Sequence, residues 1–159
     1  MITLLEPPRP AGLISGGFRY QERVTAALAD DARRETVHPE RLHEHVRAMR
    51  EATPDSTIIV DGWFADLTAR QLPAGVIPLL HMQPKTCGWA AGIARAVATG
   101  AGTATAARAE VAEVALVHPG IDDCFTPRAR CGDDAVAIIC AGTISEAVSY
   151  THLTLPTKA

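Results

Sequence analysis

The chain has 159 residues, a formal net charge of −3 and 47% hydrophobic residues, a composition typical of a globular domain and too apolar for a disordered chain. The absence of a basic stripe argues against binding to nucleic acid or to an anionic membrane. No apolar run approaches the roughly 20 residues that a membrane-spanning helix needs. The first ten residues lack the features of a signal peptide, so we expect a cytoplasmic protein.

The predicted elements alternate between helices and strands along the chain. Its first third predicts a strand at 2–6, an amphipathic helix at 18–34, a short strand at 35–39 and a helix at 39–54. Continuous apolar runs then predict buried strands at 56–62, 75–84, 94–100, 112–120 and 135–143, with an Ala-rich helix at 103–109. This alternation predicts an α/β fold with a Rossmann-like, doubly wound parallel sheet.

Four features follow predicted strands, at the edge where open α/β sheets bind ligands. Gly16 and Gly17 open the first helix, where a glycine backbone and free N–H groups suit an anion, although a plain glycine turn explains them equally well. Asp61 ends the central strand, where its carboxylate either binds a ligand hydroxyl or caps the next turn. His81 leaves the fourth strand and either donates a hydrogen bond to a substrate or is a loop histidine. His118 lies in a tight turn after the last of these strands.

The cysteines do not indicate a metal site. Cys87, Cys124, Cys131 and Cys140 are far apart and form no C-x-x-C pair, whereas zinc ligands usually come in close pairs. We therefore expect no metal and no other cofactor. The residues alone indicate an anion-binding or nucleotide-binding α/β domain.

Six segments, taken together and in order, resemble the family 4 glycosyltransferases, which are retaining enzymes of the GT-B type. They are SGGFRYQERVTAALA (15–29), DSTIIVDGWF (55–64), GVIPLLHMQP (75–84), ARAVATGAGTATA (94–106), VALVHPGIDDCFTPR (114–128) and DDAVAIICAGTISEA (133–147). The resemblance covers essentially residues 1–147. Each motif alone is loose, and the specificity lies in the ordered set.

This resemblance implies a hexosyltransferase-type enzyme that moves a sugar from a nucleotide-diphosphate sugar to an acceptor with retention of configuration and without a bound metal. The glycine loop of such enzymes approaches the donor diphosphate, and Gly16 and Gly17 match it. Its backbone amides stabilise charge on the leaving diphosphate. The histidine after the fourth strand lies against the transferred sugar, which makes His81 the expected catalytic residue, with Asp61 expected to bind substrate. The donor sugar, the nucleotide and the acceptor stay unidentified.

The resemblance also predicts how the chain is organised. Residues 1–118 are expected to form the acceptor-side domain, 119–134 the connection between domains, and 135–147 the first strand of a truncated donor-binding domain. Residues 148–157, VSYTHLTLPT, equal a translation of the transposon-end adapter used in sequencing libraries, so 148–159 is expected to be a non-native tail. The family's donor-gripping residues belong to the second domain, so the chain alone is expected to be inactive. The alternative is a stand-alone nucleotide-binding or anion-binding module without catalysis.

Overall fold

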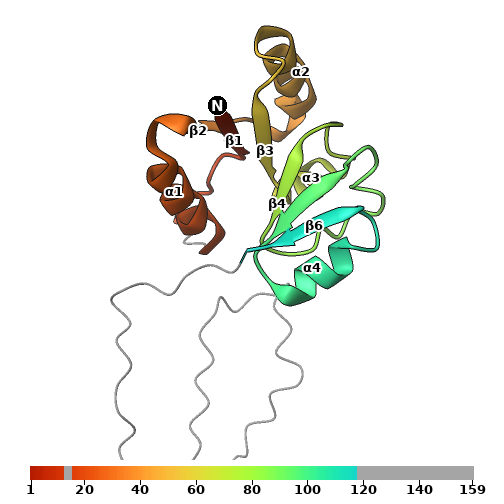
Figure 1. The fold of residues 1–159 in the computed structure, drawn as a ribbon. Coiled ribbons are helices and arrows are strands. Elements are labelled where there is room, and N and C mark those ends of the chain that lie inside the picture. Colours follow the sequence, from red (N-terminus) through yellow and green to blue (C-terminus); the bar gives the residue numbers. More distant parts are fainter. Residues whose placement is uncertain (13–15, 118–159) are drawn as a thin grey trace, which may run out of the picture. The chain divides into compact units, whose positions relative to one another are not determined.

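A parallel sheet of six strands organises the protein in the computed structural model, which describes residues 1–12 and 16–117 (Figure 1). Its strands are β1 (Ile2–Glu6), β2 (Ala32–Thr36), β3 (Thr57–Asp61), β4 (Ile77–Leu80), β5 (Arg95–Ala98) and β6 (Glu113–Leu116), in the order β2-β1-β3-β4-β5-β6. The predicted doubly wound α/β fold is thereby confirmed. The predictions made for His118, for 119–134, 135–147 and 148–159, and for three of the cysteines lie outside the described residues.

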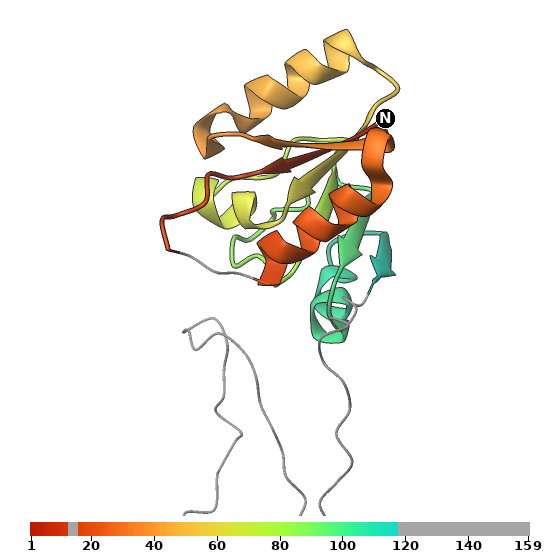
Figure 2. The same ribbon diagram turned by 90° about the vertical axis from the view of Figure 1, so that its left-hand side faces the viewer.

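Four α-helices connect these strands: α1 (Gly16–Leu28), α2 (Leu42–Ala52), α3 (Trp63–Thr68) and α4 (Ala101–Ala107). Two single-turn 3-10 helices, η1 (Ala29–Asp31) and η2 (Pro39–Arg41), precede β2 and α2. Figure 2 shows α1 and α2 on opposite faces of the sheet. Right-handed crossovers require this, because the chain moves one way from β1 to β2 and the other way from β2 to β3. Among the described residues, no helix has the length and apolar character to cross a membrane.

The hydrophobic core lies mainly on the face of the sheet covered by α2, α3 and α4. Val60 and Leu80 from the central strands meet Phe64 from α3 there, and all three side chains are fully buried. Trp89, in the long connection between β4 and β5, is also fully buried, and its indole N–H donates to Glu110. Among the described residues, Phe64 and Trp89 are thus the aromatic side chains of this otherwise aliphatic core.

The first predicted helix is too long and the strand after it is misplaced. The structure ends α1 at Leu28 and starts β2 at Ala32, whereas the predictions place the helix at 18–34 and the strand at 35–39. Ala29 has a left-handed backbone conformation with φ of 45°, which ends the helix. Alanine is not a residue type that marks a helix end in a sequence, so the end of α1 could not be predicted from it. The strand β2 is an edge strand that pairs only with β1, and its charged sequence ARRET lacks the apolar pattern of a buried strand.

The short helix α3 was not predicted. Its six residues follow directly on β3, and only Phe64 and Ala65 among them are buried. A segment of this length is too short to display helical periodicity, so the sequence signal is weak. Oδ1 of Asp61 accepts a hydrogen bond at 2.8 Å from the backbone N–H of Trp63, the first residue of this helix.

Candidate functional site

The sheet has a switch point between β1 and β3. From β1 the chain passes through α1 to β2 on one side, whereas β3 pairs with β1 on the other side. The connections that follow β1 and β3 therefore leave the sheet in opposite directions. Open α/β sheets bind their ligands in the crevice beyond the carboxyl ends of the strands at such a point.

Polar side chains gather on one face of the sheet at its carboxyl edge. Side chains alternate between the faces of a strand, and Leu4 pairs with Ile59 in the register of β1 and β3. Glu6 and Asp61, each two residues further along, therefore lie side by side on the same face. The register continues through Leu79 of β4, so His81 joins this row two residues later. All of these side chains lie beneath α1, as the following contacts show.

A chain of hydrogen bonds joins α1 to three strand ends. The side chain of Gln21 is fully buried, and its Nε2 lies 2.5 Å from Oδ2 of Asp61 and 3.4 Å from Nε2 of His81. Nδ1 of His81 lies 3.3 Å from Oγ1 of Thr99. The hydroxyl of Thr99 in turn lies 3.4 Å from the carbonyl oxygen of Leu80. We call Gln21, Asp61, His81 and Thr99 the polar cluster.

The imidazole of His81 is also enclosed by its neighbours in α1. A Cβ atom added to Gly17 would lie 2.8 Å from Cδ2 of His81, so only glycine allows the helix to pass this close to the ring. Tyr20 meets the same ring edge to face, with centroids 5.6 Å apart. At Gly16, by contrast, an added Cβ meets nothing within 4 Å among the described residues. Gly17 thus has a packing reason to be glycine, and Gly16 has none in these contacts.

Acidic and basic side chains alternate beside the polar cluster. Glu6 ends β1, and its Oε2 is 3.6 Å from Nη1 of Arg34, which lies 3.6 Å from Oε1 of Glu22. Glu22 also binds Arg9 at 2.8 Å, and the Arg9 guanidinium stacks 4.5 Å from the centroid of Phe18. Burial raises the pKa of Glu6, and the adjacent Asp61 adds to the rise, while Arg34 and Arg9 oppose it. The hydrogen bond from Arg9 lowers the pKa of Glu22.

Burial also lowers the pKa of His81, because the imidazolium form loses hydration at this place, and the opposing effect of the Asp61 carboxylate is smaller. Between the lowered pKa of the folded state and the ordinary value near 6.5, the unfolded chain binds a proton that the folded chain does not. The contribution of His81 to the free energy of unfolding therefore falls as the pH falls below about 6.5.

We expect His81→Gln to weaken this pH dependence. Urea unfolding of both proteins from about pH 7.5 to about pH 5.5 should show a smaller loss of stability in the variant. Glu6 acts in the opposite sense, because its raised pKa makes its contribution largest at low pH, and it acts equally in both proteins. If the free energy of unfolding changes equally with pH in the two proteins, His81 has the same pKa in the folded and unfolded states.

The structure brings three of the four sequence-predicted site residues together. Gly17 packs against His81, and Asp61 is linked to His81 through the amide of Gln21. Gly16 is the exposed first residue of α1, next to this group. The capping role considered for Asp61 and the ligand-binding role are compatible, because one carboxylate oxygen accepts from Trp63 N and the other from Gln21.

Sequence reasoning missed Glu6, Gln21 and Thr99. Two of them obey the rule that singled out Asp61, because Glu6 ends β1 and Thr99 directly follows β5. Gln21 had a different signal, since it is a polar residue three positions after Phe18 on the inner face of an amphipathic helix. Leu28, the last residue of the same helix, is 38% exposed and does not belong to this inner face.

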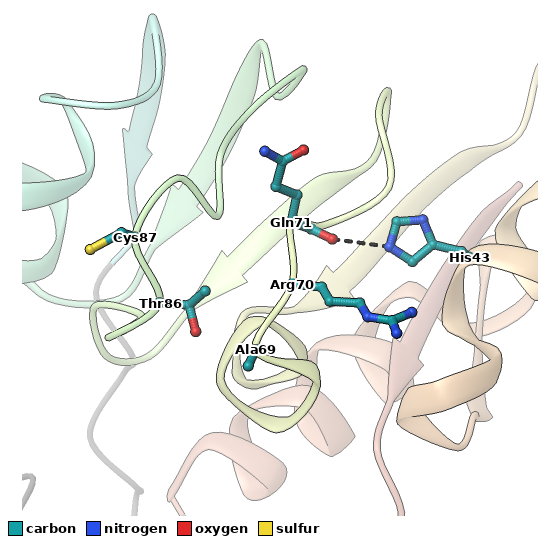
Figure 3. Close-up of a pocket in the computed structure, with 6 residues that line it drawn as sticks. All are labelled: His43, Ala69, Arg70, Gln71, Thr86 and Cys87. Atoms are coloured by element: carbon teal, nitrogen blue, oxygen red, sulfur yellow. Dashed lines mark hydrogen bonds between the residues drawn. The ribbon is translucent and has the colours of Figure 1, made fainter.

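A hollow of about 500 Å³ lies elsewhere on the protein (Figure 3). Its lining residues come from the start of α2, the end of α3 and the loop after β4: His43, Ala69, Arg70, Gln71, Thr86 and Cys87. His43 already bonds the carbonyl oxygen of Gln71 at 3.0 Å, and no lining side chain is both polar and fully buried. The buried polar groups at the switch point offer more specific chemistry than this hollow, so we place the candidate site there.

The described residues contain no group of three or more His, Cys, Asp or Glu side chains arranged to hold a metal ion. A search for related proteins adds no further assignment: no family model, no curated protein and no solved structure matches the chain.

Proposed function

We propose that residues 1–118 form the acceptor-side domain of a retaining glycosyltransferase that uses a nucleotide-diphosphate sugar. The observation that carries this proposal is the meeting of Gly17, Asp61 and His81 at one switch point. These residues lie in three separate segments of the sequence, and each segment was assigned to the site by a different motif. The ordered resemblance to family 4 glycosyltransferases supplies the reaction class.

The proposal divides the site into an anion-binding part and a hydroxyl-binding part. The backbone N–H groups at Gly16 and Gly17 lie at the N-terminus of α1, where the positive end of the helix dipole suits the diphosphate. The carboxylates of Glu6 and Asp61 would repel a phosphate placed directly against them, so they suit the hydroxyl groups of a sugar. His81 lies between the two parts, against Gly17 on one side and linked to Asp61 on the other.

The proposal is tested by titrating the isotope-labelled chain with UDP-glucose and GDP-mannose, and with UDP and inorganic phosphate for comparison. We expect NMR shift changes at the amides of Gly16 and Gly17 and at the His81 ring with the nucleotide sugars. His81→Ala should reduce the difference between UDP-glucose and UDP, because the ring is assigned to the sugar. The matched control is His38→Ala, which removes an exposed histidine whose ring pairs with Glu40 and not with a member of the polar cluster.

Two outcomes would count against this assignment, and a third would count only against the inactivity of the chain alone. Shift changes confined to the hollow of Figure 3 would place the ligand elsewhere. Equal binding of phosphate and nucleotide sugars would favour the stand-alone anion-binding module. Sugar transfer by the purified chain would contradict the proposal that the fragment is inactive alone, and sequencing the gene across codon 147 tests that proposal independently.

A further inference from the structure

The amide of Gln21 is the one side chain in the polar cluster that contacts both Asp61 and His81. It extends from α1 onto the ends of β3 and β4, and it is fully buried. A buried glutamine that bridges two ionisable groups does more than fill space, because its nitrogen only donates hydrogen bonds and its oxygen only accepts them. The direction of each hydrogen bond in the cluster can therefore be worked out.

Asp61 fixes the orientation of the amide. The Gln21 atom that lies 2.5 Å from the Asp61 carboxylate must be the nitrogen, because an oxygen there would place two acceptors against each other. This short contact to an ionised group is the strongest in the cluster. The second hydrogen of the same nitrogen is then left for Nε2 of His81, 3.4 Å away.

The orientation of Gln21 decides which nitrogen of His81 carries a proton. Nε2 faces an N–H group, so it must be the unprotonated acceptor. The ring proton then resides on Nδ1, which donates to Oγ1 of Thr99, and the Thr99 hydroxyl donates to the carbonyl oxygen of Leu80. The Gln21 amide thus donates to Asp61 on one side and to His81 on the other, and donation continues from His81 to Thr99 and on to Leu80. A proton added at Nε2 would face the Gln21 N–H.

We propose that Gln21 is a positioning residue that holds His81 as the neutral imidazole with its proton on Nδ1. Gln21 acts through His81 and does not itself need to touch a reacting atom. The titratable groups that face this arrangement are Asp61 from β3, Glu6 from β1 and Tyr20 from α1. Burial lowers the pKa of His81, and the Asp61 carboxylate opposes this change to a smaller extent. The donor contact from Gln21 leaves a proton added at Nε2 without an acceptor on that side.

The consequence for ligand binding is that His81 supplies no positive charge near neutral pH. A further buried atom of the cluster, Oε1 of Gln21, accepts no hydrogen bond within the described part of the chain, while the buried Oε2 of Glu6 beside the cluster faces Nη1 of Arg34 at 3.6 Å. The cluster thus presents acceptors, and the ligand group that it suits is a hydrogen-bond donor such as a hydroxyl. Naming this group as a sugar hydroxyl rests on the proposed function, whereas the state of His81 follows from the contacts alone.

The state of His81 is measured by imidazole nitrogen NMR on the full chain, ligand-free and at neutral pH, with the His81 signals identified by their loss in His81→Gln. We expect a proton on Nδ1 and a bare Nε2. In Gln21→Glu the new carboxyl needs a proton of its own to bond Asp61, and its oxygen facing Nε2 becomes an acceptor, so Nε2 should carry the ring proton. Gln83→Glu is the matched control, since it adds the same group at an exposed position two residues after His81 and should leave the ring proton on Nδ1.

A proton on Nε2 in the parent chain would overturn the proposal, and so would a Gln21→Glu chain that keeps its proton on Nδ1. If Gln21→Glu does not fold, Gln21→Asn decides, because the shorter amide cannot reach both partners and a mixture of the two ring forms is expected. An unmixed Nδ1 form in Gln21→Asn would equally reject the role of Gln21. These measurements use no nucleotide sugar, so their failure is distinct from a failure of the glycosyltransferase proposal.

Discussion

Replacing Gly17 with alanine is expected to lower the free energy of unfolding by about 1 to 3 kcal/mol, the usual range for an overpacked site. The new Cβ would lie 2.8 Å from Cδ2 of His81 and 3.1 Å from Cγ. The ring cannot easily move away, since Tyr20 meets it edge to face and hydrogen bonds hold both of its nitrogens. The readouts are urea unfolding and the chemical shifts of the His81 ring, which should move even if part of the strain relaxes.

Gly16→Ala is the matched control for this experiment. It makes the same change one residue earlier, in the same first turn of α1, where an added Cβ meets nothing within 4 Å among the described residues. Both substitutions gain the helical preference of alanine over glycine, up to about 1 kcal/mol. Gly16→Ala should therefore be neutral or slightly stabilising and leave the His81 ring unchanged. Equal stability of the two variants would show that α1 does not approach His81 this closely.

The central strands could be predicted because a strand buried on both faces of a parallel sheet consists of a continuous run of apolar residues. The runs around Val60, Leu80 and Ala98 place β3, β4 and β5 within a few residues of their observed bounds. The edge strand β2 carries no such run, because only β1 pairs with it and most of its side chains face solvent. Its charged residues continue a helix pattern equally well, which is why the end of α1 was misplaced.

The candidate site was predictable only at the positions that topology alone identifies. Asp61 and His81 stand at strand ends, so a strand prediction is enough to place them at one edge of the sheet. Gln21 reaches the site from the middle of a helix, and its partners are 40 and 60 residues away in the sequence. Nothing local in the sequence indicates that pairing, since it depends on how α1 crosses the sheet.

Asp61→Ala is expected to destabilise the protein by about 2 to 5 kcal/mol. The carboxylate is buried and accepts one hydrogen bond from Nε2 of Gln21 and another from the backbone N–H of Trp63. Removing it leaves two donors without their acceptor, and each buried group of this kind costs about 1 to 3 kcal/mol. The loss of the charge also relieves the repulsion that helps to raise the pKa of Glu6, which offsets part of the cost.

Asp61→Asn removes the negative charge of the side chain but keeps a hydrogen-bond acceptor, so it separates the two effects. Its carbonyl oxygen can still accept from Trp63 N, so the stability loss should be smaller than in Asp61→Ala. The carboxylate that raises the pKa of His81 is gone, so an NMR titration should show that pKa falling further below its ordinary value near 6.5.

Asp55→Ala, in the exposed turn before β3, should change stability by less than about 0.5 kcal/mol. A His81 pKa that is unchanged or higher in Asp61→Asn would contradict the electrostatic link between these two residues, and a loss in Asp61→Ala no larger than in Asp55→Ala would contradict the buried hydrogen bonds.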